Sequence, residues 1–372
     1  MVAGEASSDL LGGLLLQGLR QRWPQVQAGG IGGPRMVAEG FQAWAPADRL
    51  SVFGYVDALA RLPELLALRR RTALRIEHER PDVFVGIDAP DFNFGLEKRL
   101  RRAGLKTVHF VCPSIWAWRP QRVHTLREAA DHVLCLFPFE PDLLTPHGVN
   151  ATFVGHPLAD VLPLEVPRAQ ARAHLGLPAE AEVLALLPGS RLSEVRLIGP
   201  TLVEAAQRLL VQRPGLRLVL PAAPSVAAEV QRVFAPLLAT GRLLCVQGQS
   251  HAALAAADQC WVASGTATLE AALLKCPMVV VYRVSALNWW RMKGQALQPW
   301  VSLPNILSQR HWVPELLQDA LQPQALLAAS QAWWGDAPRR EAFANEALAL
   351  HEQLRQDTAQ RAGQALARVL AA

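Results

Sequence analysis

Two carboxylates and an amide follow a short apolar strand in the segment VGIDAPDFNFGLEKRL, which covers residues 85–100. Asp88 ends the predicted strand, Asp91 follows three residues later, and Asn93 precedes a predicted helix. A strand that is apolar on both faces is typical of a parallel sheet. Because such sheets bind ligands beyond the carboxyl ends of their strands, these three side chains are candidates for proton transfer or substrate binding.

A second candidate site lies in the later half of the chain, where a predicted strand turns into a helix. In LPGSRLSEV, residues 187–195, Gly189 lets a ligand approach the backbone, and Ser190 can cap the helix. The amino end of a helix attracts anions, and the Arg191 guanidinium matches the geometry of a phosphate. The segment favours a phosphate site, although an ordinary turn with a solvated arginine gives the same pattern.

The segment ASGTATLEA, residues 263–271, repeats this arrangement after another predicted strand. The small polar residues that open its helix are Ser264, Gly265, Thr266 and Thr268. Glu270 follows, where it can accept hydrogen bonds from a ribose diol or from the start of its own helix. Two helix starts suited to anions favour a nucleoside diphosphate site.

Two further segments place polar or aromatic residues after predicted strands. GEASSDLLGG, residues 4–13, puts Glu5 and Ser7 in a turn, where Ser7 or Ser8 can cap a helix. FVCPSIWAWRP, residues 110–120, puts Trp116 and Trp118 at a strand end. The two indole rings either line a cleft or pack against the sheet, and the sequence leaves both readings open.

The segment at residues 51–75 is apolar in its first part, and its later part, residues 61–75, combines five arginines and several leucines with one glutamate. The leucines include Leu62, Leu65, Leu66 and Leu68, and the central arginines are Arg69, Arg70 and Arg71. A helix of this composition suits the surface of an anionic bilayer, since leucines enter the acyl region and arginines bind headgroups. The alternative is an ordinary surface helix with a solvated charged face.

Predicted strands and helices alternate along most of the chain, which indicates parallel sheets covered by helices. In the first half, strands are predicted at 83–87, 107–111, 133–136 and 152–154, and helices at 93–103 and 119–129. In the second half, strands are predicted at 183–187, 216–220, 243–246, 259–262 and 277–282. The pattern predicts an α/β fold of two Rossmann-like, doubly wound domains that face a cleft, with helices at the carboxyl end.

A proline-rich stretch without a strand pattern, residues 156–183, separates the two halves. We therefore expect domains at residues 1–160 and 161–340, followed by helices at 341–372. Packing of these last helices against the first domain is one arrangement that the sequence allows. The chain begins at what looks like the last residues of a strand, so we expect the first strand to be short or absent.

The amino-acid composition limits the classes of protein to which this chain can belong. The 372 residues are 51% hydrophobic and 19% charged, which is typical of a globular protein. The net charge of +5 is a mild bias that suits phosphorylated substrates or anionic lipid, and nothing beyond it favours nucleic acid. No apolar run reaches the ~18 residues of a membrane span, and no signal peptide is visible. The five cysteines lack CxxC spacing, so we expect reduced thiols in a cytoplasmic protein.

Taken together, the motifs resemble the lipid-A-disaccharide synthases, a family of glycosyltransferases with the two-domain GT-B architecture. The matching segments are VAGEAS, VGIDAPDFN, PSIWAWR, LPGSR, ASGTATLEA, PMVVVYR and VSLPNIL. They follow the family's order from residue 2 to about residue 318. The family pattern has glycine at the position of Ser8, where serine costs roughly 1 kcal/mol if the backbone requires a positive φ.

The resemblance implies a reaction of UDP-2,3-diacylglucosamine with 2,3-diacylglucosamine 1-phosphate. The products are UDP and a β(1→6) disaccharide, the precursor of lipid A. Asp88 is then the general base, with Asp91 and Glu5 as further catalytic candidates, while Asp91 and Asn93 either orient Asp88 or bind the acceptor. Asn93, Ser7, the two tryptophans and the helix at 61–75 belong to the acceptor and lipid side.

On the donor side, the resemblance assigns the charge of the leaving diphosphate to Arg191 and to the two helix starts. Glu270 binds the ribose, and Tyr282, Asn305 and Gln309 contact the nucleotide or the donor sugar. We expect no metal and no cofactor, because the sequence contains no DxD, HExxH or P-loop motif. The expected location is the cytoplasmic face of the inner membrane, with an anionic lipid surface as partner and a homodimer as an open question.

Two other readings fit part of the sequence. Another GT-B enzyme, such as a UDP-N-acetylglucosamine epimerase or a cell-wall N-acetylglucosamine transferase, has the same sheet pattern. It leaves IDAPDFN beside PSIWAWR, and the arginine–leucine surface, without an explanation. A non-enzymatic two-domain binding protein is the second alternative; such proteins are usually exported, and no export signal is seen.

Overall fold

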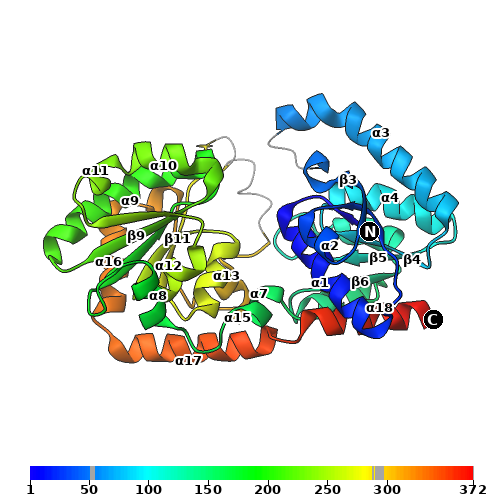
Figure 1. Cartoon of the computed structure of the whole chain (residues 1–372). Helices are drawn as coiled ribbons and strands as arrows, with labels where there is room; N and C mark the ends of the chain where they lie inside the picture. Colours follow the sequence, from blue (N-terminus) through cyan, green and yellow to red (C-terminus); the bar gives the residue numbers. More distant parts are fainter. Residues whose placement is uncertain (51–54, 287–288, 290–296, 372) are drawn as a thin grey trace. The chain divides into compact units, whose positions relative to one another are not determined.

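The computed structural model describes residues 1–50, 55–286, 289 and 297–371. The first part of the segment at 51–75, residues 51–54, lies outside this description. The chain divides into two compact units, Met1–Asp160 with Gln353–Ala372 and Val161–Glu352. Each unit has its own parallel sheet with helices around it, which confirms the predicted α/β fold class (Figure 1).

The first unit contains a seven-stranded sheet in the order β3-β2-β1-β4-β5-β6-β7. The strands are β1 (Val2–Ala3), β2 (Gly29–Gly32), β3 (Gln42–Pro46), β4 (Val83–Ile87), β5 (Lys106–Phe110), β6 (His132–Cys135) and β7 (Ala151–Phe153). β1 is short, as expected, and pairs with both β2 and β4. The strand order reverses between β1 and β4, and parallel sheets bind ligands beyond the carboxyl ends at such a reversal.

The helices of the first unit connect these strands. They are α1 (Ala6–Arg22), α2 (Pro34–Ala38), α3 (Tyr55–Glu79), α4 (Pro90–Arg102), α5 (Arg122–Ala129), α6 (Glu140–Leu144), α7 (Pro157–Val161) and α18 (Thr358–Ala371). Short 3-10 helices, η1 (Ala47–Leu50) and η2 (Thr145–His147), complete the connections. Of these, α4 and the segment before α5 follow directly on the carboxyl ends of β4 and β5.

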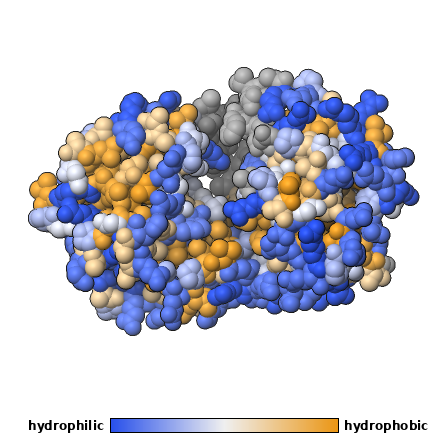
Figure 2. All heavy atoms as spheres, in the orientation of Figure 1, coloured by the Kyte–Doolittle hydropathy of each residue, from blue (hydrophilic) through white to orange (hydrophobic). Residues whose placement is uncertain are grey.

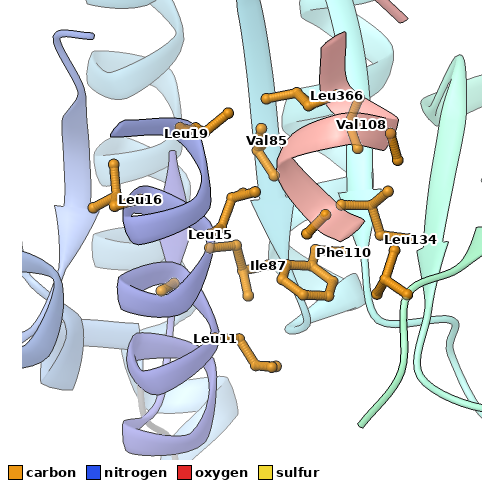
Figure 3. Packing of buried hydrophobic residues seen from close by; sticks show 14 of the residues in the cluster. Leu11, Leu15, Leu16, Leu19, Val85, Ile87, Val108, Phe110, Leu134 and Leu366 are labelled. Carbon is orange, nitrogen blue, oxygen red and sulfur yellow. The ribbon is translucent and has the colours of Figure 1, made fainter. Parts of the chain in front are cut away.

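The core of the first unit explains why β4 and β5 are held rigidly. In α1 the buried leucines recur at helical spacing, Leu11, Leu15 and Leu19, and form one apolar face. This face packs toward Ile87 of β4 and Phe110 of β5 (Figure 3). Each fully buried side chain of this size contributes roughly 1.5–3 kcal/mol, so the strand ends that carry Asp88 are firmly anchored.

The last helix of the chain completes this core. α18 packs beside α1, although more than three hundred residues separate them (Figure 1). The contact depends on glycine, because a Cβ on Gly18 would lie 1.8 Å from the Ala359 carbonyl oxygen. A Cβ on Gly363 would likewise lie 2.9 Å from the Gly18 carbonyl oxygen. Any side chain at either glycine would push the two helices apart.

The second unit contains a six-stranded parallel sheet in the order β10-β9-β8-β11-β12-β13. The strands are β8 (Val183–Leu187), β9 (Arg217–Ala222), β10 (Leu243–Gln247), β11 (Gln259–Ala263), β12 (Met278–Tyr282) and β13 (Glu315–Leu317). The order reverses between β8 and β11. The glycine turns of the LPGSR and ASGTATLEA segments follow these two strands, so both lie at the reversal.

The helices of the second unit alternate with its strands. They are α8 (Arg168–His174), α9 (Leu192–Gln212), α10 (Ala227–Val233), α11 (Ala235–Leu238), α12 (Ser250–Ala256), α13 (Thr266–Leu273), α15 (Leu303–Ser308), α16 (Pro323–Trp334) and α17 (Ala337–Leu354), with 3-10 helices η3 (Pro224–Val226) and η4 (Gln318–Ala320). On the visible face of each unit, hydrophobic residues are scattered among hydrophilic ones (Figure 2). Among the described residues, no helix is long and apolar enough to cross a bilayer.

Three expectations about local structure need correction. The helix expected from residue 119 begins at Arg122, because Arg119 precedes Pro120 and has φ of +52°. The helix expected from residue 93 begins earlier, at Pro90, since proline is favoured in the first turn. Ser8 lies inside α1 and is not among the residues with positive φ, so the expected strain at this position does not arise.

Candidate active site

The turn that carries Asp88 has an unusual backbone. Asp88 and Ala89 have φ values of +52° and +44°, so two consecutive non-glycine residues adopt the left-handed conformation. The Asp88 N–H donates to the Phe110 carbonyl oxygen of β5 at 2.8 Å, which ties the turn to the neighbouring strand. Strained backbone of this kind is concentrated at functional sites, where surrounding structure holds it in place. The Asp88 side chain lies at the reversal between β1 and β4.

Asn93 holds the Asp88 turn from inside. Its side chain is fully buried, and Nδ2 lies 2.8 Å from the Asp88 carbonyl oxygen. Longer contacts from the same nitrogen reach the carbonyl oxygens of Val2, at 3.3 Å, and Ile87, at 3.4 Å. The amide thus bridges the ends of β1 and β4. This geometry gives Asn93 a role in positioning Asp88, one of the two roles that the sequence left open.

A buried ion-pair geometry lies one helical turn beyond Asn93. Glu97 Oε1 and His109 Nδ1 are 2.7 Å apart, and both side chains are fully buried. Gly86 makes room for the pair, because a Cβ there would lie 2.1 Å from Glu97 Oε1. Sequence reasoning missed this pair, although Glu97 follows Asn93 at the i, i+4 spacing that places both on one helix face.

Asp91 differs from Asp88 in both exposure and partner. Its side chain is 89% exposed, and Oδ1 accepts a hydrogen bond from Arg122 Nη2 at 2.7 Å. An ion pair this exposed contributes only about 0–1 kcal/mol to stability. Asp91 is therefore available to ligands but is not held rigidly, which makes it the weaker candidate for a base.

Glu5 lies in the turn after β1, whereas Ser7, which was expected in the same turn, lies in the first turn of α1; both are exposed. Glu5 is the residue that precedes α1, and it forms a capping box with Ser8, whereas Ser7 takes no part in it. In this capping box the buried Ser8 hydroxyl accepts a hydrogen bond from the Glu5 N–H at 2.9 Å, and it also accepts one from the Gly4 N–H at 3.2 Å. Glu5 and Ser7 remain exposed polar groups beside the strand reversal.

Trp116 packs inward and has a buried carboxylate as partner. Its Nε1 donates to Glu140 Oε1 at 3.1 Å, and its ring meets those of Phe137 and Phe139 edge to face. The N–H groups of Leu136 and Phe137 donate to Glu140 Oε2. Burial raises the pKa of Glu140 to about 7, and the three hydrogen bonds offset only part of that effect. No sequence motif marks Glu140, so its role became visible only in the structure.

Trp118 points outward instead. It is 43% exposed, and the Arg119 guanidinium carbon lies 4.4 Å from its ring centroid. Arg122 contacts the same ring at 5.7 Å. Trp116 therefore packs against neighbouring rings, which is one of the two roles that the sequence left open. Trp118 belongs instead to an exposed cluster with two arginines.

In the second unit, several hydrogen-bond donors of the turn after β8 bind the carboxylate of Glu194. Gly189 has φ of +110°, and a Cβ there would lie 2.3 Å from Glu194 Oε2. The N–H groups of Ser190 and Arg191 donate to Glu194 Oε2 at 3.0 and 3.2 Å. Arg191 Nη1 lies 3.1 Å from Glu194 Oε1. The residue that precedes α9 is Arg191, not Ser190 as expected. The Glu194 carboxylate therefore occupies the place where an anionic ligand was expected.

Tyr282, at the end of β12, lies in the same electrostatic environment. Partial burial raises the pKa of its phenol, the charge of Glu194 raises it further, and Arg191 acts in the opposite direction. The tyrosine hydroxyl therefore stays protonated and can donate a hydrogen bond near the Gly189 turn.

The start of α13 has fewer free groups than the sequence indicated. The Ser264 hydroxyl donates to the Val301 carbonyl oxygen at 2.8 Å. The buried Thr268 hydroxyl donates to the Gly265 carbonyl oxygen and accepts from the Leu303 N–H. Gly265 has φ of +147° and, like Thr266, is exposed. Gly265 and Thr266 therefore form the accessible part of this helix start.

Glu270 faces the neighbouring helix α12. Its Oε2 accepts a hydrogen bond from the Ser250 hydroxyl at 3.2 Å and lies 3.3 Å from His251 Nε2. The hydrogen bond to Glu270 raises the pKa of His251, while burial opposes this shift. The carboxylate is thus held by two side chains of α12.

Asn305 is buried and fully engaged with the protein. Its Nδ2 donates to Val313 O and Glu315 Oε1, and its Oδ1 accepts from the N–H groups of Trp312 and Val313. These four bonds use all donors and acceptors of the amide, so a ligand contact expected from the sequence would have to break one of them. Gln309 is exposed, with its Nε2 bound to the Ile306 carbonyl oxygen.

The basic segment of the first unit forms part of α3. Leu62 and Leu66 are 46% and 45% exposed, and Leu65 is partly buried. Leu68, in contrast, packs into the core, so its expected place on a lipid-facing surface is wrong. The leucines differ because one face of an amphipathic helix packs against the core while the opposite face is exposed to solvent.

The three central arginines of α3 also differ. Arg70 and Arg71 are exposed. Arg69 packs against α4, so closely that a Cβ on Gly95 of that helix would lie 2.5 Å from Arg69 Nη1. Arg70 and Arg71 are therefore the pair that can meet an external anionic surface.

A cavity of about 570 Å³ lies at the opposite edge of the first sheet, near the amino ends of its strands. It is lined by Arg101, Lys106, His132 and Arg368, among others. The Asp88 turn is at the carboxyl ends, so this cavity is not part of the candidate active site.

The chain matches known proteins over nearly its whole length. The family model of lipid-A-disaccharide synthetase matches residues 1–369. The lipid-A-disaccharide synthase of Verminephrobacter eiseniae is 53% identical over 380 residues, covering 100% of this chain and 97% of that protein. The enzyme of the same name from Pseudomonas aeruginosa is 51% identical over 366 residues, covering 98% and 96%.

Among solved structures, a UDP-GlcNAc 2-epimerase from Neisseria meningitidis matches with a TM-score of 0.61 and 11% identity, covering 98% of this chain and 96% of that one. The glycosyltransferase of kitacinnamycin matches with a TM-score of 0.59 and 17% identity, covering 98% and 95%. At such low identities these likenesses show the fold alone. The family model and the relatives above show more: the chain belongs to the lipid-A-disaccharide synthase family.

Proposed function

We propose that this enzyme joins UDP-2,3-diacylglucosamine to 2,3-diacylglucosamine 1-phosphate and releases UDP. Membership of the lipid-A-disaccharide synthase family supports the reaction class. The observation that carries the site assignment is the strained Asp88–Ala89 turn, which holds a carboxylate at the strand reversal of the first unit. In this proposal the first unit binds the acceptor and the second unit binds the UDP-sugar.

The chemical step is a single displacement at C1 of the donor sugar. The acceptor 6-hydroxyl attacks C1 from the side opposite UDP, and the new bond has the β configuration. The bond between C1 and the diphosphate oxygen breaks, and its electron pair leaves with UDP. Asp88 accepts the proton of the attacking hydroxyl as the bond forms. Asp91 and Glu5 are exposed enough to bind the acceptor, but neither is fixed as Asp88 is.

The leaving diphosphate needs positive charge, and the Gly189 turn can provide it. The donors are the N–H groups of Ser190 and Arg191 together with the Arg191 guanidinium. For these groups to reach a diphosphate, Glu194 must first release them. The Tyr282 hydroxyl and the exposed start of α13 at Gly265 and Thr266 supply further donors close to the strand reversal.

Glu270 is assigned to the ribose, because its carboxylate can accept hydrogen bonds from a diol. Ser250 and His251 hold it in place in this role. Gln309 is exposed and remains a candidate for contact with the nucleotide or the donor sugar. Asn305 is assigned a structural role, since its amide is saturated by bonds to its own unit.

We assign the membrane contact to α3. Both substrates are acylated and therefore reside in a bilayer, so the enzyme must bind at the bilayer surface to reach them. Leu62 and Leu66 are exposed on the same helix as Arg70 and Arg71, and this combination suits an anionic bilayer. The proposed location is therefore peripheral, at the cytoplasmic face of the inner membrane.

The test is UDP release by the purified full chain. We expect release only when the acylated donor and the acylated acceptor 1-phosphate are both present, and a disaccharide should form in equal amount. UDP-N-acetylglucosamine alone serves as the control for a 2-epimerase, the activity named for several structural neighbours. Epimerisation of that sugar, or UDP release without acceptor, would contradict the proposal.

A further inference from the structure

Two arginines and a tryptophan form a cluster on the surface after β5. The guanidinium carbons of Arg119 and Arg122 lie over the ring of Trp118, 4.4 and 5.7 Å from its centroid. Trp118 as a residue is 43% exposed, although tryptophan is usually more deeply buried. We call these three residues the Trp118 cluster. Its exposure indicates that the cluster is not needed to fill the core.

The backbone of this cluster is held in an unfavourable conformation. Arg119 has φ of +52°, which a non-glycine residue adopts at a cost of roughly 1 kcal/mol. Hydrogen bonds from Trp118 N to Ser114 O, at 3.1 Å, and from Arg122 N to Arg119 O, at 3.0 Å, hold the segment in place. The fold therefore places Arg119 over the ring against its local preference, as is common where a side chain binds a ligand.

The cluster is joined to the Asp88 region through Asp91. Arg122 Nη2 donates to Asp91 Oδ1 at 2.7 Å, and Asp91 is only three residues beyond Asp88. In the part of the chain that the structure describes, this is the only side-chain hydrogen bond of Arg122, and the Arg119 guanidinium has none. A guanidinium carries five donors, so most donors of this pair have no partner among the described residues, and both arginines are partly exposed, the Arg122 side chain by 18%.

We propose that Arg119 and Arg122 bind the phosphate of the acceptor sugar; this inference rests on the proposed function. The acceptor carries its phosphate on C1 and its attacking hydroxyl on C6 of the same ring. A phosphate site must then lie about one sugar ring away from the base, and Arg122 is joined to the first turn of α4, directly after Asp88. Paired guanidinium groups match a phosphate monoester in both charge and geometry.

This assignment gives the enzyme a way to tell its two substrates apart. Both are diacylated glucosamines, but only the acceptor has a terminal phosphate monoester on C1. The donor carries UDP at that position, and its diphosphate belongs to the Gly189 turn of the second unit. Arg119 and Arg122 therefore determine which substrate occupies the acceptor position, while the Gly189 turn determines which substrate leaves UDP.

The experiment compares two acceptors, 2,3-diacylglucosamine 1-phosphate and the same sugar without its phosphate. With the parent enzyme, we expect kcat/KM to be clearly higher for the phosphorylated acceptor. Arg122→Gln and Arg119→Gln should each lower kcat/KM for that acceptor roughly 10- to 100-fold, the range of a lost charge-assisted hydrogen bond. For the acceptor without phosphate, the same substitutions should change kcat/KM less than about threefold, because no phosphate contact is lost.

Arg127→Gln is the matched control, since Arg127 is an exposed arginine on the same helix α5. It should leave the preference for the phosphorylated acceptor unchanged. Equal losses with both acceptors, or an equal loss in the Arg127 variant, would overturn the proposal in favour of a structural or general charge effect. A parent enzyme that does not distinguish the acceptors would also overturn it, while UDP release would still support the proposed function. No turnover of either acceptor would contradict the proposed function itself.

Discussion

The carboxylate of Glu194 lies 3.1 Å from the guanidinium of Arg191, and it also accepts the Arg191 N–H at 3.2 Å. The two residues are three apart in sequence, so this is an interaction within the first turn of α9. Glu194 therefore occupies the N–H groups and the guanidinium that the proposed function assigns to the leaving diphosphate. If that proposal holds, a bound diphosphate has to displace the Glu194 carboxylate.

Substitution of Glu194 by glutamine should strengthen UDP binding. Glutamine keeps an acceptor for the helix N–H groups but removes the charge that opposes a diphosphate and bonds to Arg191. We expect Kd for UDP to fall about threefold to tenfold, which corresponds to the difference between a charge-assisted and a neutral hydrogen bond. Calorimetric titration with UDP measures this change. Weaker or unchanged binding would mean that Glu194 stays in place as a helix cap when UDP is bound.

Replacement of Arg191 by alanine should have the opposite effect. Loss of a charge-assisted phosphate contact costs about 1.5–3 kcal/mol, so Kd for UDP should rise roughly 10- to 100-fold. Arg196→Ala is the control, because Arg196 lies on the same helix and pairs with Glu229. UDP affinity should be nearly unchanged in this control. An Arg191 variant that binds UDP like the parent would remove Arg191 from the proposed leaving-group site.

Asp88→Asn tests the general base. The asparagine side chain has nearly the same shape, so the fold and UDP binding should be retained. Turnover should fall about 10²- to 10⁴-fold, the range for loss of general-base catalysis. Asp91→Asn is the comparison, and its exposed ion pair with Arg122 predicts a change of less than about fivefold. Rates and melting curves should be measured together, and parent-like turnover of the Asp88 variant would exclude Asp88 as the base.

Glu140→Gln should remove a pH dependence of stability. The pKa of Glu140 is raised from 4.5 to about 7, so between these values the folded protein binds more protons than the unfolded chain. The free energy of unfolding contributed by this group is therefore highest below the unfolded value and decreases as pH rises toward the folded value. The loss is on the order of 3 kcal/mol, from the size of the shift.

Denaturant titrations of parent and Glu140→Gln between pH 5 and about 8 measure this contribution. The glutamine variant should gain stability relative to the parent as pH rises across this range. Asp142→Asn, at an exposed position on the same helix α6, should follow the parent. Parallel pH curves for the parent and the Glu140 variant would show that Glu140 titrates normally.

Arg70→Gln together with Arg71→Gln should weaken binding to anionic vesicles. Each arginine near such a surface contributes about 1 kcal/mol, so the pair predicts a loss of about 2 kcal/mol at low salt. Salt should reduce the binding of the parent, because it screens this attraction. Co-sedimentation with vesicles is the measurement, and activity on detergent-dispersed substrate should change much less.

Arg75→Gln is the control for this surface. Arg75 also lies on α3, but its guanidinium pairs with Glu79 and stacks on Trp44 at 4.1 Å. It should therefore contribute less to lipid binding than Arg70 and Arg71. If the double variant sediments like the parent at low salt, α3 is an ordinary solvated helix, and the lipid surface lies elsewhere.

The sequence alone determined the fold class and the location of the important turns. Runs such as Val183–Leu187 are apolar on both faces and short, and the structure has a buried strand there. The turns at Asp88 and Gly189 were also identified, because a polar or small residue after such a strand is a local pattern. Boundaries were less accurate where proline shifted them, as at Pro90 and Pro120.

Only the tertiary structure decided what each polar side chain does. Asp88, Asp91 and Asn93 are close in sequence, yet Asn93 is fully buried beneath the turn and Asp91 is 89% exposed. The environment of Asn93 depends on β1, and that of Asp91 depends on Arg122 of α5; both elements come from other parts of the chain. Glu140 was missed for the same reason, since its partner Trp116 lies 24 residues earlier. A sequence pattern reports spacing along one element, whereas hydrogen bonding and desolvation depend on which other elements pack against it.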